Sequence, residues 1–195
     1  KCPLEAWSTI SAGRRWTQPA AAEGTDEAQA VDTTTQDAST EGTSAADDCA
    51  ALPIVVATDP TAAGPSPHVV DGWSSLVPTA QDELEASTGT PGTLASRIAA
   101  VGGCTTAAGP GAALALADAE GRVDRYVATA NELRRADLAA CRVVVVDTGE
   151  LGDDRSDRCE ALRALDATVG RLVDELPEGW RVVVAGVSDS PTTEE

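Results

Sequence analysis

Large aromatic and sulfur-containing apolar residues are almost missing from this sequence of 195 residues. It has no Phe, no Met and a single Tyr, while Ala, Val and Leu supply most of the 42% apolar share. The core must therefore be largely aliphatic, together with four Trp. The length suits one sizeable domain, and we predict a single domain over residues 1–195.

Basic residues are also scarce. Fourteen Lys and Arg stand against 32 Asp and Glu, which gives a formal net charge of −18. Such a charge argues against binding to nucleic acid or to an anionic membrane surface. A halophilic α/β protein of unrelated function has a similar balance, and that alternative predicts folding only at molar salt.

No run of about 20 apolar residues and no signal peptide is visible. We therefore expect contact with a membrane only through helices of a parent chain outside this segment. The sequence begins at Lys1 without Met and in the middle of a motif. We expect it to be a piece of a longer protein.

The five cysteines lack the CxxC or CxxH spacing of a zinc site. We predict an oxidising compartment with two disulfides, Cys2–Cys49 and Cys104–Cys141, and a free thiol at Cys159. The second disulfide would join the entries of two neighbouring strands. The alternative is a set of five reduced, buried thiols.

Residues 19–50 form an acidic insertion. Its tract from Pro19 to Asp48 holds eight acidic residues, no basic residue and almost no large apolar side chain. Such a tract buries too little surface to offset the entropy of ordering it, so we predict a solvated insertion loop.

Strand-like and helix-like segments alternate in the rest of the chain. Predicted strands cover residues 52–59, 104–109, 122–128, 141–149 and 180–187, and predicted helices cover 92–103, 112–119, 130–140 and 155–176. This alternation predicts an α/β fold with a mainly parallel sheet flanked by helices. The valine runs of the last two strands predict burial on both faces, as neighbours near the sheet centre.

Two carboxylates follow these valine strands. Asp147 ends one strand and Asp189 ends the next, so both are expected on one rim of the sheet, where α/β proteins place their sites. Together with Glu150, Asp153 and Asp154 they could hold a divalent cation, because hard ions take oxygen ligands. The alternative is that these groups cap helices or lie in solvated loops.

The other candidates have simpler interpretations. His68 lies in a Pro-rich stretch without a triad partner, which indicates a surface histidine. Gly109-Pro110-Gly111 precedes a helix but belongs to no phosphate-loop motif, which indicates a turn and a helix cap. Ser8, Thr9 and Ser11 lack the GxSxG pattern of a nucleophile elbow.

Several segments together resemble a known group of proteins. They are "CPLEAWSTISAGRR", "GTLASRI", "AAGPGAALALADAEGRVDRY", "CRVVVVDTG" and "VVVAGVSDSP". In this order they resemble a group of actinobacterial cell-envelope proteins that are similar to the alkaline phosphatase superfamily. The resemblance implies part of a three-layer sandwich, an extracytoplasmic location and a parent chain with membrane-spanning helices, without an assigned activity.

The residues that would carry superfamily chemistry are missing. The nucleophile would stand at Lys1 or upstream, the histidine expected after Asp189 is replaced by Ser190, and no histidine follows Asp147. The resemblance thus implies a non-catalytic domain of an envelope protein, with a binding or structural role toward an unknown envelope protein or ligand and no cofactor. The alternative is a metal-dependent phosphatase, phosphodiesterase or sulfatase-like hydrolase, with a divalent cation on Asp147, Asp153, Asp154 and Asp189.

Overall fold

A computed structural model of the chain describes residues 3–13, 51–57, 68–77, 89–149, 151 and 155–187. The predicted insertion at 19–50 lies outside these residues, as do Cys2, Cys49 and Asp189. In chain order the elements are α1 (Pro3–Ala12), β1 (Val55–Ala57), β2 (His68–Val70), α2 (Trp73–Leu76), α4 (Thr93–Ala100), β3 (Thr105–Ala108), α5 (Pro110–Leu116), β4 (Arg122–Val123), β5 (Arg125–Val127), α6 (Arg135–Ala140), β6 (Val143–Val146) and α7 (Arg155–Glu175).

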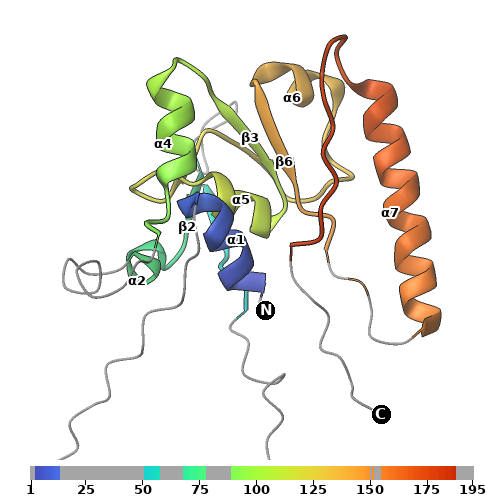
Figure 1. Ribbon diagram of the computed structural model, residues 1–195, viewed down its shortest axis with the longest axis horizontal. Coiled ribbons are helices and arrows are strands. Elements are labelled where there is room, and N and C mark those ends of the chain that lie inside the picture. The colour runs from blue at the N-terminus through green and yellow to red at the C-terminus, as the bar shows by residue number, and fades with distance from the viewer. Residues whose placement is uncertain are drawn as a thin grey trace, which may run out of the picture.

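The strands form two small sheets (Figure 1). In the first, β3 lies between β5 and β6, and both pairings are parallel. In the second, β2 lies between β1 and β4 in antiparallel pairings that the sequence analysis did not anticipate. The predicted α/β class with a parallel sheet is confirmed at this coarse level.

One predicted strand is divided between the two sheets. The period-two pattern over 122–128 predicts a single strand, but β4 ends at Val123 and β5 begins at Arg125. Between them, the Asp124 carboxylate accepts hydrogen bonds from the backbone N–H and the hydroxyl of Thr105, at 2.9 and 3.2 Å. These bonds tie the crossing point to the start of the central strand β3.

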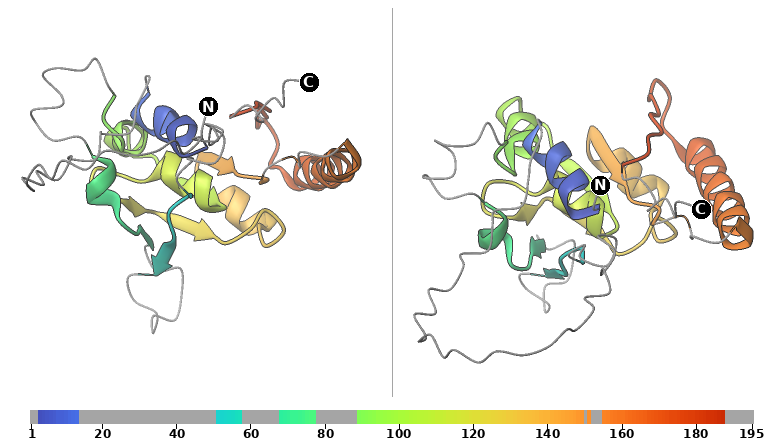
Figure 2. Two further views of the ribbon diagram at one scale, coloured as in Figure 1. Left: turned by 90° about the horizontal axis from the view of Figure 1, so that it is seen from below. Right: turned by 60° about the horizontal axis from the view of Figure 1, so that its bottom comes forward.

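The larger core cluster lies on one face of the parallel sheet, against α1 and α5 (Figure 2). Every residue of α5 from Gly111 to Leu116 is buried. Alanine and glycine dominate this helix, so it approaches its neighbours closely. A Cβ atom on Gly111 would overlap the indole of Trp7 from α1. Small residues at this contact therefore set how closely α1 and α5 pack.

A smaller cluster lies on the opposite face. Its buried residues are Ala108, Leu133 and Leu138, and Val144 and Val146 of β6 pack against it. Alternating valines of β6 therefore serve different clusters, since Val143 and Val145 pack on the larger one. This alternation is the geometry of a strand with apolar neighbours on both faces.

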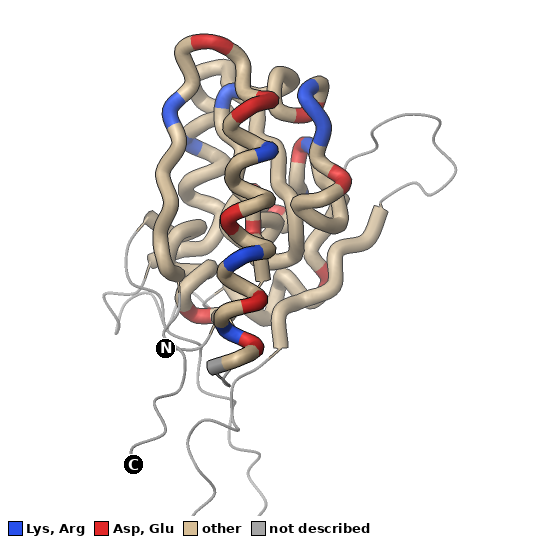
Figure 3. Tube along the Cα trace, turned by 90° about the vertical axis from the view of Figure 1, so that its right-hand side faces the viewer, with Lys and Arg blue, Asp and Glu red and all other residues tan. Residues whose placement is uncertain are grey.

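Helix α7 lies beside the sheet at one end of the molecule. Charged residues of both signs are distributed along its length (Figure 3). The apolar residues of this helix pack on the sheet only in part. Leu172 and Leu176 pack against the smaller cluster, whereas Leu162 is 45% exposed. The Arg171 guanidinium donates to the backbone oxygens of Leu133 and Ala130, at 3.1 and 2.6 Å. Helix α7 is therefore attached mainly through its C-terminal half.

The predicted buried strand at 180–187 is not formed. Residues 181–187 are extended but belong to neither sheet, and Val182, Val183 and Val184 are 51%, 89% and 68% exposed. Among the strands that the structure describes, β6 therefore lies at the edge of its sheet, and its valines are half-buried rather than fully buried. The valine pattern reports strand preference, but it does not determine whether the segment reaches a partner strand.

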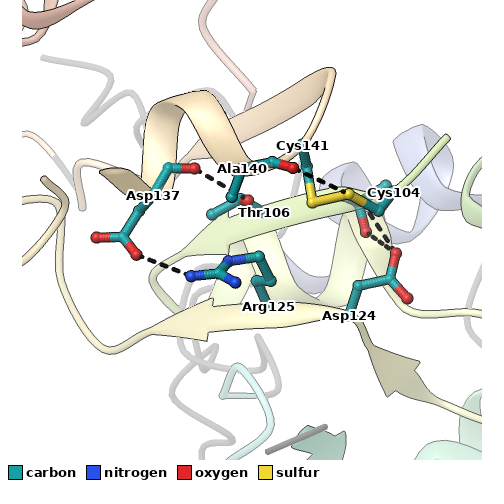
Figure 4. Close-up of a disulfide and its surroundings, with 8 residues drawn as sticks. Cys104, Thr106, Asp124, Arg125, Asp137, Ala140 and Cys141 are labelled. Atoms are coloured by element: carbon teal, nitrogen blue, oxygen red, sulfur yellow. Dashed lines mark hydrogen bonds and ion pairs between the residues drawn. A yellow bond between two sulfur atoms is a disulfide. The ribbon is translucent and has the colours of Figure 1, made fainter. Parts of the chain in front are cut away.

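The structure contains the predicted Cys104–Cys141 disulfide, with Cα atoms 5.0 Å apart (Figure 4). Cys104 precedes β3 and Cys141 precedes β6, and these strands are paired in parallel. The two cysteines therefore meet where neighbouring strands begin. Cys159 is an exposed free thiol on α7.

Candidate functional site

Asp147 is the one predicted metal ligand within the described residues, and it lies directly after β6 at the carboxyl edge of the parallel sheet. Its Oδ2 accepts a hydrogen bond from the backbone N–H of Gly111 at 2.9 Å, and its Oδ1 accepts one from Gly149 at 2.9 Å. Its own N–H donates to the Ala108 oxygen at 2.8 Å, which extends the ladder between β6 and β3. Both carboxylate oxygens thus have backbone donors.

The bond to Gly111 makes Asp147 a remote cap of helix α5. Gly109, before the helix, carries no side chain that could cap it, and Pro110 occupies the first helical position. The first N–H groups of a helix have no partner within it, and a carboxylate there is further stabilised by the helix dipole. The turn-and-cap interpretation of Gly109-Pro110-Gly111 is therefore correct, with the cap supplied by a residue far along the chain.

Close packing holds the Asp147 side chain in place. A Cβ atom on Gly109 would lie 3.0 Å from the Asp147 Cβ, and one on Gly111 would lie 2.7 Å from its Oδ2. Gly109 also has a φ of +89°, in the region that favours glycine. The two glycines therefore let the carboxylate reach the helix terminus between β3 and α5.

His68 and Tyr126 lie across from each other on the two sheets. Their ring centroids are 5.2 Å apart and the planes are tilted by 51°. His68 was predicted to be a surface residue of a Pro-rich stretch, but it is half-buried on β2 and paired with Ala57 and Val123. Burial raises the pKa of the Tyr126 hydroxyl, and the negative charges of Glu132 and Asp147 raise this pKa further. This hydroxyl therefore stays protonated at neutral pH.

The serine hydroxyl groups of α1 are buried in the protein. Ser11 is buried, and its Oγ accepts a hydrogen bond from the Gly92 N–H at 2.8 Å. Ser8 is fully buried, and within the described residues its Oγ has no hydrogen-bond partner. Both hydroxyls therefore lie inside the protein.

The remaining predicted rim residues, Glu150, Asp153, Asp154 and Asp189, lie outside the described residues. Whether Asp147 and Asp189 meet on one rim stays a prediction. Among the residues that the structure describes, no group of three His, Cys, Asp or Glu side chains is arranged to hold a metal ion.

The chain matches no protein-family model, no curated protein and no solved structure. The resemblance to envelope proteins of the alkaline phosphatase type therefore stays an expectation from the sequence. Over the described ranges, no helix has the length and apolarity needed to cross a membrane.

A second polar cluster lies around the disulfide, and the sequence analysis missed it (Figure 4). The Arg125 guanidinium lies 3.3 Å from Asp137 Oδ1, while Asp137 Oδ2 accepts the backbone N–H of Arg134 at 3.1 Å. The Thr106 hydroxyl donates to the Asp137 backbone oxygen at 3.4 Å. Asp137 thus holds the start of α6 against β3 and β5. The predicted helix over 130–140 starts too early to mark Asp137 as a residue of the first turn, so its capping role was visible only in the structure.

Proposed function

We propose that this chain is a non-catalytic, extracytoplasmic α/β domain with a binding or structural role in a larger envelope protein. The observation that supports it most directly is the bonding of Asp147. Its two oxygens accept backbone N–H groups at 2.9 Å, and the bond from Gly111 gives this carboxylate a structural role as a cap of α5. A metal ion at this carboxylate would also face the two N–H groups and the positive end of the α5 dipole, which disfavour a cation there.

The disulfide supports the extracytoplasmic part of the proposal. Disulfides persist in oxidising compartments and are rare where thiols are kept reduced. Cys104 and Cys141 begin two paired strands, so their bond reinforces the sheet that carries the candidate site. The kinship with alkaline phosphatase-like envelope proteins belongs to the same proposal, and it rests on the sequence segments quoted above.

The proposal is tested by assaying the chain of residues 1–195 with nitrophenyl phosphate, bis-nitrophenyl phosphate and nitrophenyl sulfate, each with Mg²⁺, Mn²⁺ or Zn²⁺. We expect no hydrolysis above that of buffer and metal alone. Metal-dependent hydrolysis that is lost in Asp147→Asn and Asp189→Ala, but kept in Asp166→Asn on exposed α7, would establish the hydrolase alternative instead.

Thermal unfolding and calorimetric titration with divalent ions distinguish the non-catalytic domain from the metal-dependent hydrolase without an activity assay. Under our proposal Asp147→Asn lowers the thermal midpoint of unfolding, because an amide cannot accept both backbone N–H groups. It leaves the response to divalent ions unchanged. Saturable binding of one divalent ion by the unmodified chain, abolished in Asp147→Asn, would contradict the proposal.

A further inference from the structure

Residues Arg181–Val187 present an apolar strand-like segment to solvent. Val182, Val183 and Val184 are 51%, 89% and 68% exposed, although β-branched residues in sequence favour the extended, half-buried environment of a sheet. Three consecutive exposed valines leave a large apolar area in contact with water. This area would be reduced if the segment joined a sheet.

The edge of β6 lies nearby and is open. In the sheet order β5-β3-β6, β6 is paired through four residues with β3 and, among the described residues, with no strand on its other side. Such an edge exposes unpaired N–H and C=O groups, and proteins usually cover or pair it. The edge therefore offers the hydrogen bonds that the valine segment lacks.

The chain is anchored on opposite faces of β6, once shortly before the segment and once at its last residue. Leu176, at the end of α7, packs on the smaller cluster with Val144 and Val146. Val187 packs on the larger cluster, as do Val143 and Val145. Between these anchors the segment lies between β6 and α7 and runs in the direction of β6 (Figures 1 and 2).

We propose that Arg181–Val187 is a strap that adds to the free edge of β6 as a fourth, parallel strand, and that the structure shows its unpaired state. The connection from β6 through α7 to the strap is the strand–helix–strand unit that joins parallel neighbours. Because Val187 already faces the larger cluster, Val183 and Ala185 would join that face, and Val182 and Val184 would turn toward α7. Closure would bury the valines and remove the exposed edge.

Amide hydrogen exchange by NMR on the whole chain tests the strap. A strand at a sheet edge bonds its neighbour through alternate residues. We therefore expect every second amide from Val182 to Val187 to exchange about tenfold or more slowly than in an unstructured chain. Exchange at unstructured rates throughout 182–187 would overturn the proposal. Protection that disappears on dilution would also overturn it, because a second copy would then occupy the edge.

Val183→Pro and Val184→Pro serve as controls for each other. Neighbouring N–H groups point to opposite sides of a strand, so only one of the two prolines removes a bond to β6. We expect one variant to lose the alternating protection, while the buried amide of Leu114 in α5 keeps its protection in both. Loss in only one of the two variants, with Leu114 unchanged, supports the strap, whereas equal loss in both or unchanged protection in both overturns it.

Discussion

At the candidate site, two glycines without side chains determine the arrangement more than any reactive group does. Gly109 and Gly111 have no side chain, and this lets the Asp147 carboxylate and the Trp7 indole converge on the start of α5. The arrangement is packed around backbone donors. Asp147 therefore acts as a helix cap, and substitutions at this site should change the free energy of unfolding.

Gly111→Ala should destabilise the fold by about 1–3 kcal/mol, because its Cβ would overlap Trp7 and approach Asp147 Oδ2 at 2.7 Å. Gly170→Ala in α7 is the matched control. A Cβ there meets nothing within 4 Å, so the change should leave stability unaffected or raise it by up to about 1 kcal/mol. Urea unfolding compares the two variants. Equal effects of both substitutions would show that the Trp7 contact is absent.

Tyr126 makes stability sensitive to alkaline pH. Burial raises the pKa of its hydroxyl in the folded chain above the ordinary value of about 10, so the unfolded chain loses this proton first. The contribution is fully present below pH 10 and is lost as the pH rises through the folded pKa. We expect the free energy of unfolding to fall more steeply above pH 10 in the unmodified chain than in Tyr126→Phe.

Tyr126 is the only tyrosine, so the ultraviolet absorbance of tyrosinate reports this residue alone. The absorbance titration of the folded chain should lie at higher pH than that of the urea-unfolded chain. Coincident titration curves would contradict the burial of this ring against the larger cluster.

At the scale of elements, the disulfide and the attachment of α7 determine which parts of the fold are held firmly. The Cys104–Cys141 bond connects the entries of β3 and β6. In contrast, α7 is held by Leu172, Leu176 and the two bonds of Arg171 to backbone oxygens. The parallel sheet should therefore be more resistant to local opening than the N-terminal half of α7.

Replacing both Cys104 and Cys141 by Ser should lower the free energy of unfolding by about 2–4 kcal/mol, given their separation of 37 residues. Cys159→Ser is the control, because this thiol is exposed and free. It should change stability by no more than about 0.5 kcal/mol. A double variant as stable as the control in urea would contradict a structural role for the disulfide.

At the scale of the whole molecule, the net charge of −18 is the dominant feature. Charges of one sign repel each other in the compact state, and added salt screens this repulsion. Raising NaCl from about 0.01 M to about 0.15 M shortens the screening length roughly fourfold. We expect the thermal midpoint to rise by at least about 2–4 °C, corresponding to about 1 kcal/mol for a chain of this size.

The same salt series near pH 4.2, the isoelectric point of the sequence, provides the control, because little net charge remains there to screen. A rise of equal size at both pH values would show that salt acts by another route. A chain that folds only at molar salt would instead favour the halophilic alternative.

Much of the local architecture was predictable from the sequence. The alternation of strand and helix patterns located β3, β6, α6 and α7, and it gave the α/β class. The pairing of Cys104 with Cys141 was also predicted, because each cysteine begins a predicted strand and the two strands were expected to be neighbours. The positions of strands and helices depend on residues close together in the chain, and for that reason periodicity reports them.

Other features depended on the tertiary structure alone. The use of Asp147 as a cap for α5, the division of 122–127 between two sheets and the edge position of β6 all bring together residues distant in sequence. A valine run has the same strand preference at the edge of a sheet as at its centre. Likewise, the sequence pattern of an aspartate at a strand end is the same whether its carboxylate binds a metal ion or caps a helix. Only the packing of α1, α5 and the parallel sheet decides between these outcomes, because it determines which donors and surfaces each residue meets.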